Sequence, residues 1–142
     1  MSAEQVFSMA NTAALLGWLV LAVFGPRRWA APLVTGAILP LLLAVLYAGL
    51  IAANFGKSQG GFGSLAGVAQ LFSNPWLLLA GWVHYLAFDL FIGSWEVRDA
   101  RNRGIAHWMV IPCLALTFFF GPVGLLLYFL LRIAKARSVV LD

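Results

Sequence analysis

The sequence predicts an all-α integral membrane protein, a polytopic four-helix bundle with little chain outside the bilayer. Of its 142 residues, 63% are hydrophobic and 10% are charged, and the mean hydropathy is +0.94. A soluble domain needs a larger share of charged surface residues. Apolar stretches long enough to cross the hydrocarbon core use most of the chain and leave no room for a soluble catalytic domain. We therefore expect residues 1–142 to form a single transmembrane domain.

The first two spans are expected at about residues 6–24 and 30–53. Both stretches are uncharged, and the turn between them, Gly25-Pro26-Arg27-Arg28, combines turn-forming residues with a basic anchor. Pro40 lies inside the second stretch and removes one backbone donor, so we expect a kink there.

A Gly/Ser/Asn-rich connection joins the second and third spans. In its second part, Leu65, Val68, Leu71 and Phe72 have the spacing of one helix face. This pattern predicts a short helix that lies in the membrane interface or partly covers the bundle. A disordered connection is the alternative.

The third and fourth spans are expected at about residues 75–95 and 108–131. Ser73-Asn74-Pro75 is typical of a helix start. A charged turn from Glu96 to Gly104 separates the two spans. The fourth stretch contains Gly121-Pro122-Val123-Gly124, a group that can break the helix into two halves.

The distribution of Lys and Arg predicts the orientation. The turns after the first and third spans hold five basic residues, whereas the N-terminus and the long connection hold only Lys57. The positive-inside rule then places both turns in the cytoplasm and both termini outside. The basic tail with Arg132, Lys135 and Arg137 argues the other way. The first span lacks a basic region before it, which predicts a retained span.

Ionisable residues inside a span are the first functional candidates, because burying them in lipid is costly. His84 and Asp89 both lie in the third span. Their separation of five residues places them on different helix faces, whereas Tyr85 and Asp89 share one. Trp82 and Glu96 lie on the same stripe, with Asp99 near it if the helix continues. The alternative is that Asp89 and His84 only bridge helices and that the turn charges only anchor headgroups.

Several classes of site are disfavoured by spacing and depth. A bis-histidine haem would need His84 and His107 at one level, yet one is expected mid-membrane and the other at the interface. No pair of metal ligands shares a helix face at ExxH or HxxxH spacing, and Cys113 is a lone cysteine within an apolar run. The chain has no phosphate-binding loop and no GxSxG motif. We expect no metal, no cofactor and no nucleic-acid partner.

Three longer runs and one short run carry a resemblance to a known family. They are Gly81–Gly93 (GWVHYLAFDLFIG), Asp99–His107 (DARNRGIAH), Phe120–Tyr128 (FGPVGLLLY) and Ile111-Pro112-Cys113-Leu114. Together they resemble the abscisic-acid-deficient-four-like membrane family, whose plant members are linked to neoxanthin synthesis. The resemblance covers about residues 74–131 and reaches the first two spans only as a hydrophobic pattern.

The resemblance implies a carotenoid-related function, the conversion of violaxanthin to neoxanthin. This isomerisation opens an epoxide and creates an allene without net redox change, so it needs an acid for the epoxide oxygen and a base for a polyene carbon. We expect Asp89 to be the acid or base, with His84 and Tyr85 as its partners. Glu96 and Asp99 complete the candidate catalytic set. The candidate substrate-binding set is Trp82, Arg98, Arg101, Arg103 and His107, whose arginines would hold the polar ring end.

The absence of a plant transit segment favours a bacterial inner-membrane protein and leaves a different isoprenoid substrate open. Two other functions are weighed against a carotenoid isomerase. One is a non-enzymatic lipid- or pigment-binding scaffold subunit that stabilises a pigment enzyme. The other is a small transporter, which so few polar residues disfavour. The expected partners are a membrane lipid or carotenoid, and a second copy of the chain or a pigment enzyme.

Overall fold

The computed structural model describes residues 1–137, and every regular element in that range is a helix. Three of these helices are long and apolar enough to cross a membrane. They are α1 (Ala3–Phe24), the continuous helix of η1 (Ala30–Ile38), α2 (Leu39–Asn54) and η2 (Phe55–Lys57), and α4 (Pro75–Asn102). The prediction of an all-helical membrane-type protein is confirmed, and the prediction of four spans is wrong.

The first helix begins at a capping box and packs closely on α4. The Ser2 side chain accepts from the Gln5 backbone, and the Gln5 side chain accepts from the Ser2 backbone. Further along, Trp18 lies directly on Gly93 of α4, where an added Cβ would lie 2.7 Å from the indole ring. The absence of a side chain at Gly93 therefore sets how closely α1 and α4 approach.

The second membrane helix begins as a wide π-helical segment, η1, that leads into α2 around Pro40. The Leu39 N–H donates to the carbonyl of Val34, five residues back, instead of four. The Thr35 hydroxyl donates to the Ala30 carbonyl at 3.3 Å. These wide turns accommodate Pro40, which has no N–H to donate. The sequence predicted a kink at Pro40, and the structure has a π-helical segment before it.

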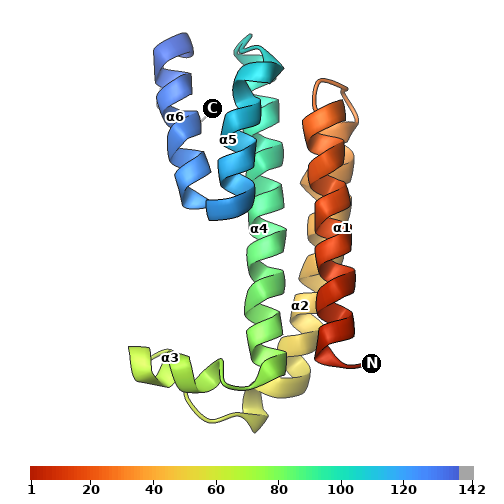
Figure 1. The fold of residues 1–142 in the computed structure, drawn as a ribbon, viewed down its shortest axis with the longest axis vertical. Coiled ribbons are helices and arrows are strands. Elements are labelled where there is room, and N and C mark those ends of the chain that lie inside the picture. The colour runs from red at the N-terminus through yellow and green to blue at the C-terminus, as the bar shows by residue number, and fades with distance from the viewer. Residues whose placement is uncertain (138–142) are drawn as a thin grey trace.

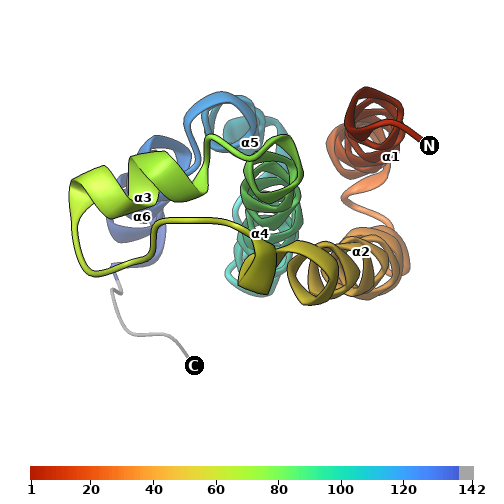
Figure 2. The same cartoon turned by 90° about the horizontal axis from the view of Figure 1, so that it is seen from below.

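The predicted short helix between the second and third spans is present as α3 (Leu65–Leu71). The Ser64 hydroxyl caps it by accepting from the Gly67 N–H at 3.0 Å. It lies across the N-terminal end of α4, roughly perpendicular to the long helices (Figures 1 and 2). This orientation is the one expected of a helix lying along a membrane surface.

The third membrane helix, α4, is longer than predicted. It continues through the expected charged turn as far as Asn102. Only a few residues then connect it to α5 (His107–Phe120). The helix persists because Glu96 and Asp99 find polar partners on the last two helices. The prediction of an irregular segment from Glu96 is therefore wrong.

The predicted fourth span is instead a hairpin of two half-length helices, α5 and α6 (Pro122–Ala136). The chain reverses at Gly121, which has φ +43°, and Pro122 begins the second helix. With 14 and 15 residues, the two helices are about 21–22 Å long, shorter than the roughly 30 Å hydrocarbon core. The hairpin turns back beside the middle of α4, and α6 returns to the end where α5 began (Figure 1).

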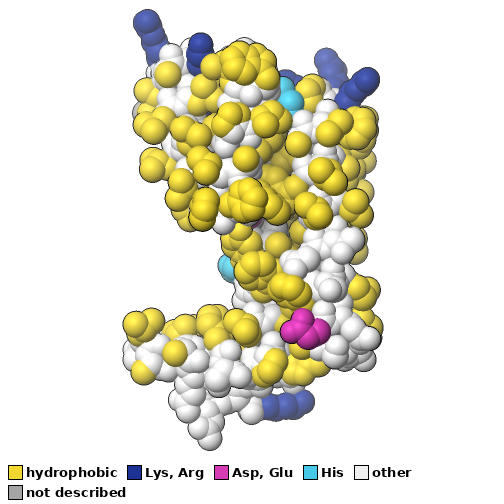
Figure 3. Space-filling view, viewed as in Figure 1, with side chains coloured by type: hydrophobic (Ala, Val, Ile, Leu, Met, Phe, Trp, Pro, Cys, Tyr) yellow, Lys and Arg dark blue, Asp and Glu magenta, His cyan; other side chains and the backbone are white. Residues whose placement is uncertain are grey.

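The re-entrant hairpin separates the two ends of the described chain. The N-terminus lies at the same end of the molecule as α3, whereas α6 finishes at the opposite end, the end that also carries the α1–η1 turn (Figure 1). This arrangement of residues 1–137 does not support the expected placement of both termini on one side. Most Lys and Arg side chains visible in Figure 3 gather at the end where α6 finishes, which we call the basic end. Glu4 and Lys57 belong to the other end, at the start of α1 and the end of η2.

Candidate functional site

Asp89 lies near the middle of α4 and faces the turn of the α5–α6 hairpin. A Cβ added at Gly121 would lie 2.9 Å from Asp89 Oδ1, so only glycine permits this approach. Gly121 is also the N-cap residue of α6. The Asp89 carboxylate therefore lies at the positive end of a helix dipole in the middle of the membrane protein, a position that favours a negative charge.

Tyr85 lies one turn before Asp89 on the same face of α4. Its hydroxyl donates to the backbone carbonyl of Phe118 at 2.7 Å, close to the hairpin turn, and it also interacts with the Asp89 carboxyl. Trp82 stacks against Tyr85, with ring centroids 5.2 Å apart. The Trp82 indole N–H donates to Asn11 Oδ1 of α1 at 2.7 Å.

A cavity of about 380 Å³ lies in front of these groups, between α1, α4 and the end of α5. Trp82 and Tyr85 of α4 form one wall, and Phe118 of α5 lies beside them. Leu15 and Phe119, which also line it, are exposed on the apolar surface. We call this space the lateral cavity, because its rim faces sideways, where lipid chains would lie. A tyrosine hydroxyl with a carboxyl one turn behind it, at an apolar cavity, is an arrangement that can exchange a proton with a lipid.

Glu96 lies two turns beyond Asp89 and is completely buried, with 0% exposure. Its Oε1 accepts from the Thr117 hydroxyl of α5 at 2.9 Å. Its Oε2 has no hydrogen-bond partner within residues 1–137, and neither does Oδ2 of Asp89. A Cβ at Gly124 of α6 would overlap Thr117, so the glycine allows the two hairpin helices to close around this threonine.

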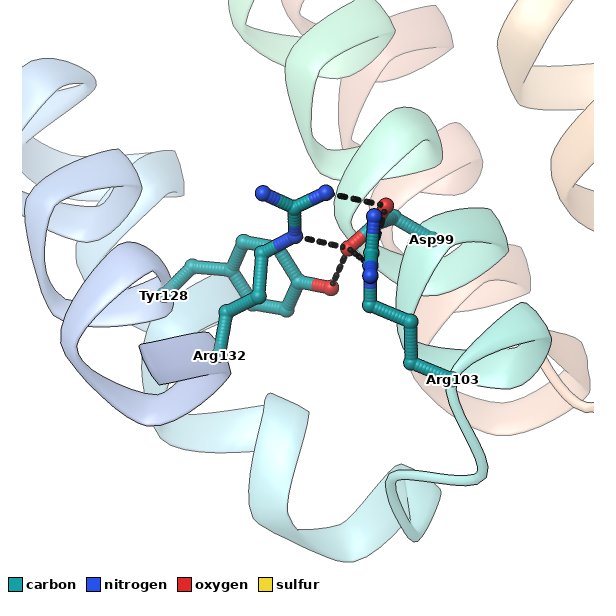
Figure 4. Close-up of polar contacts among 4 residues, drawn as sticks. All are labelled: Asp99, Arg103, Tyr128 and Arg132. Atoms are coloured by element: carbon teal, nitrogen blue, oxygen red, sulfur yellow. Dashed lines mark hydrogen bonds and ion pairs between the residues drawn. The ribbon is translucent and has the colours of Figure 1, made fainter. Parts of the chain in front are cut away.

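Asp99 is the centre of an ion-pair cluster that fastens the hairpin to α4 (Figure 4). It accepts from the Tyr128 hydroxyl at 2.6 Å and from Arg132 Nε at 2.8 Å, both on α6. It also accepts from Arg103 Nε at 3.0 Å. Arg132 is fully buried and lies 5.6 Å from the Phe129 ring centroid. The cluster satisfies a buried arginine, and its carboxylate is occupied by protein groups.

Sequence reasoning missed Tyr128 and Arg132 as partners of Asp99. The available signal was their spacing, since residues four apart on a helix share a face, in a stretch otherwise almost free of charge. Arg132 was instead assigned to a basic tail. Arg103, expected to bind substrate, lies in the same cluster as Asp99.

His84 is not part of the Tyr85–Asp89 arrangement. It lies on another face of α4, exposed, between the rings of Tyr47 and Phe88 at centroid distances of 5.5 and 4.7 Å. It lines a separate cavity of about 270 Å³ with Tyr47 and residues of η2 and α3. The structure therefore separates His84 from Asp89, as their spacing predicted, and does not make His84 the partner of Asp89 that was expected from the family resemblance.

The remaining candidates lie at the basic end. Arg98 and Arg101 are exposed on the last turns of α4. His107 Nε2 lies 2.8 Å from the Ala22 carbonyl, and His107 and Arg101 share the lining of a third cavity of about 250 Å³. These groups are far along α4 from Tyr85 and do not line the lateral cavity. Within residues 1–137, no group of three or more His, Cys, Asp or Glu side chains could hold a metal ion.

Comparison with known proteins supplies a family. The family model described as ABA4-like, or ABA DEFICIENT 4-like, matches residues 5–128. This range runs from α1 to Tyr128 and includes Tyr85, Asp89, Glu96 and Asp99. No curated protein matches the chain, and no solved structure matches it.

Proposed function

The chain belongs to the ABA DEFICIENT 4-like family, and from this we propose that it acts on a carotenoid or a related isoprenoid lipid as a xanthophyll epoxide isomerase-like enzyme. The observation that carries the proposal is the lateral cavity, which Tyr85 lines, with the Asp89 carboxyl one helix turn behind Tyr85 against the hairpin turn. The family membership supports the choice of an isoprenoid lipid as substrate, and the cavity supports the choice of Tyr85 and Asp89 as the reacting groups.

The proposed chemistry moves one proton to an oxygen and one from a carbon. Tyr85 gives its hydroxyl proton to the epoxide oxygen as one C–O bond breaks, and Asp89 takes a proton from the neighbouring polyene carbon. An O–H bond and a new carbon–carbon double bond form, so the product is an isomer of the substrate. The apolar cavity excludes the water that would otherwise hydrolyse the epoxide.

The hairpin provides the route by which a lipid reaches these groups. Because α5 and α6 turn back halfway, they cover only the half of α4 nearer the basic end, and the space-filling view shows a hollow between the hairpin and α3 (Figure 3). Trp82 of α4, which lines the lateral cavity, is exposed in the uncovered half. We propose that the linear polyene lies against Trp82 and enters the lateral cavity sideways from the bilayer.

A non-enzymatic pigment-binding subunit is the second candidate, and one contact favours it. The Tyr85 hydroxyl donates to the Phe118 carbonyl, which ties α4 to the hairpin and would serve a purely structural role. In that case the same cavity holds the polyene without changing it. The two candidates differ only in whether the bound lipid is converted.

Expression in a host that accumulates epoxide xanthophylls distinguishes the candidates. Extracted pigments and pigments that copurify with the protein are compared for the wild type, Asp89→Asn, Tyr85→Phe and His84→Ala. Ser94→Ala is the matched control, because Ser94 is buried on α4 but donates to Thr35, away from the cavity. All variants are first compared for yield and monodispersity.

The isomerase predicts a new pigment of unchanged mass with the wild type, the control and His84→Ala. It predicts a loss of about 100-fold or more with Asp89→Asn and Tyr85→Phe, the usual size of a general acid–base contribution. Copurification of unchanged pigment with every variant would support the binding subunit and contradict the enzyme. If well-folded protein neither binds nor converts pigment, both candidates are wrong.

A further inference from the structure

We propose that Glu96 is a proton-relay residue that connects the Asp89 carboxyl to the water at the basic end of the molecule. The inference deepens the proposed function, in which Asp89 takes a proton inside a lipid-facing cavity. It starts from the position of Glu96, which the proposed chemistry does not use. Glu96 lies between Asp89 and the Asp99 cluster on one continuous helix face.

The unpaired oxygen of Glu96 is the first observation. A fully buried carboxyl with Oε2 unpartnered within residues 1–137 is costly to keep. Buried polar groups of this kind recruit water or exchange a proton. A glutamine or leucine would serve packing at lower cost, so the carboxyl indicates a role that needs a proton.

The neighbours of Glu96 are the second observation. Toward the lateral cavity, its carboxyl interacts electrostatically with Asp89, and the Thr117 hydroxyl lies on Oε1. Toward the basic end, it interacts with Tyr128 of α6, whose hydroxyl donates to Asp99. From α5, Cys113 is the other titratable neighbour. Glu96 thus lies on α4 between the Asp89 carboxyl and the Asp99 cluster.

The ends of this path are the third observation. Asp99 and Arg103 have side-chain exposures of 12% and 15%, so water reaches the path at the basic end. The rise of the seven residues from Asp89 to Glu96 is about 10 Å, so the proposed relay needs Thr117 and one or two water molecules to bridge the gap. The other faces of α4 at this level carry Leu90 and Val97, which are buried and apolar.

The relay keeps Asp89 in proton exchange with water between cycles. Within a cycle, Tyr85 gives one proton to the substrate and Asp89 takes one from it, so transfer of that proton from Asp89 to Tyr85 restores both groups and the protein gains and loses none. An Asp89 that is protonated before the substrate binds passes its proton to Glu96, which becomes the carboxylic acid. Glu96 then releases the proton to water beside Asp99 and returns to its starting state.

The relay can be tested without any pigment. The full chain, tagged at its C-terminus, is reconstituted in sealed liposomes and treated with dicyclohexylcarbodiimide, a lipid-soluble reagent that adds to protonated carboxyl groups. External protease removes the tag only from molecules whose basic end faces outward, so the two orientations can be separated. Labelling of Asp89 is then measured by peptide mass spectrometry while the pH is changed on one side at a time.

We expect acidification on the side of the basic end to raise Asp89 labelling severalfold, and acidification on the other side to leave it unchanged. Glu96→Gln, which keeps an acceptor for Thr117, should remove this dependence, and Thr117→Val should slow the response. Ser94→Ala should respond like the wild type. If Glu96 had only a structural role, Asp89 labelling in Glu96→Gln would depend on the pH at the basic end as it does in the wild type.

Retention of the wild-type response in folded Glu96→Gln would overturn the relay, as would a response to the opposite side. Absence of Asp89 labelling at every pH would also overturn it, because the relay requires Asp89 to take up protons. The labelling experiment uses no substrate. If Asp89 labelling responds as expected but the expression experiment shows no pigment conversion, the proposed function is contradicted and the relay is not.

Discussion

At the residue scale, the acidic side chains of α4 have different roles although they lie along one face of the helix. Asp99 is occupied by Tyr128, Arg132 and Arg103 and stabilises the hairpin. Asp89 has one oxygen with no hydrogen-bond partner within residues 1–137, one helix turn from Tyr85, which lines the lateral cavity. The distinction between a structural and a reactive carboxyl therefore comes from their partners, which lie on helices distant in the sequence.

Removing the charge of Asp99 tests its structural role. Asp99→Asn removes the carboxylate charge that pairs with the fully buried Arg132, so we expect the free energy of unfolding to fall by about 3 kcal/mol. The measurement is unfolding in mixed detergent micelles followed by circular dichroism. Arg98→Gln is the control, because Arg98 is exposed on the same helix and should change little. Equal stability of Asp99→Asn and the wild type would show that the cluster does not hold the hairpin.

The sequence allowed the shared face of Trp82, Tyr85, Asp89 and Glu96 to be predicted, because helix periodicity alone places them together. It did not show that Arg132 would be buried, because an arginine after an apolar stretch is usually a headgroup anchor. It also did not show that Glu96 and Asp99 belong to a helix. Their charges are typical of a turn, and the groups that compensate them come from α5 and α6.

At the element scale, the α5–α6 hairpin determines where the candidate site lies. Hydropathy continues without interruption through Gly121, so residues 108–131 have the length and composition of a span. The Gly-Pro pair can break or bend a helix, and sequence alone cannot distinguish a bend from a full reversal. The reversal depends on the close packing of Thr117 with Gly124 and of Gly121 with Asp89.

Substitution of Gly121 tests the turn. Gly121→Ala requires a side chain at φ +43° and places its Cβ against the Asp89 carboxylate, so we expect a loss of about 2 kcal/mol in unfolding free energy. Gly49→Ala is the matched control, because a Cβ at Gly49 would meet nothing within 4 Å and should be neutral or slightly stabilising. Both are measured as for Asp99→Asn. An equal change in unfolding free energy for the two substitutions would show that Gly121 does not form a tight turn against Asp89.

At the scale of the whole molecule, the re-entrant hairpin explains the distribution of charge. With four spans, the basic tail would lie opposite the basic turns, which conflicts with the positive-inside rule. With three membrane-crossing helices and a hairpin, α6 finishes at the same end of the molecule as the α1–η1 turn, and the basic residues of the turns and of α6 gather at this end (Figure 3). The rule then predicts the basic end in the cytoplasm and the N-terminus outside.

The proposed site, the lateral entry of a lipid and the proton relay all depend on a hairpin that turns back inside the membrane. The most direct test is the sidedness of the two chain ends, measured in intact cells with a cysteine at Ser2 or at Arg137 in a Cys113→Ala background and a membrane-impermeant thiol reagent. We predict labelling from outside at residue 2 only, with residue 137 labelled after the membrane is opened. Labelling of both positions from the same side would mean an even number of crossings and would contradict the account.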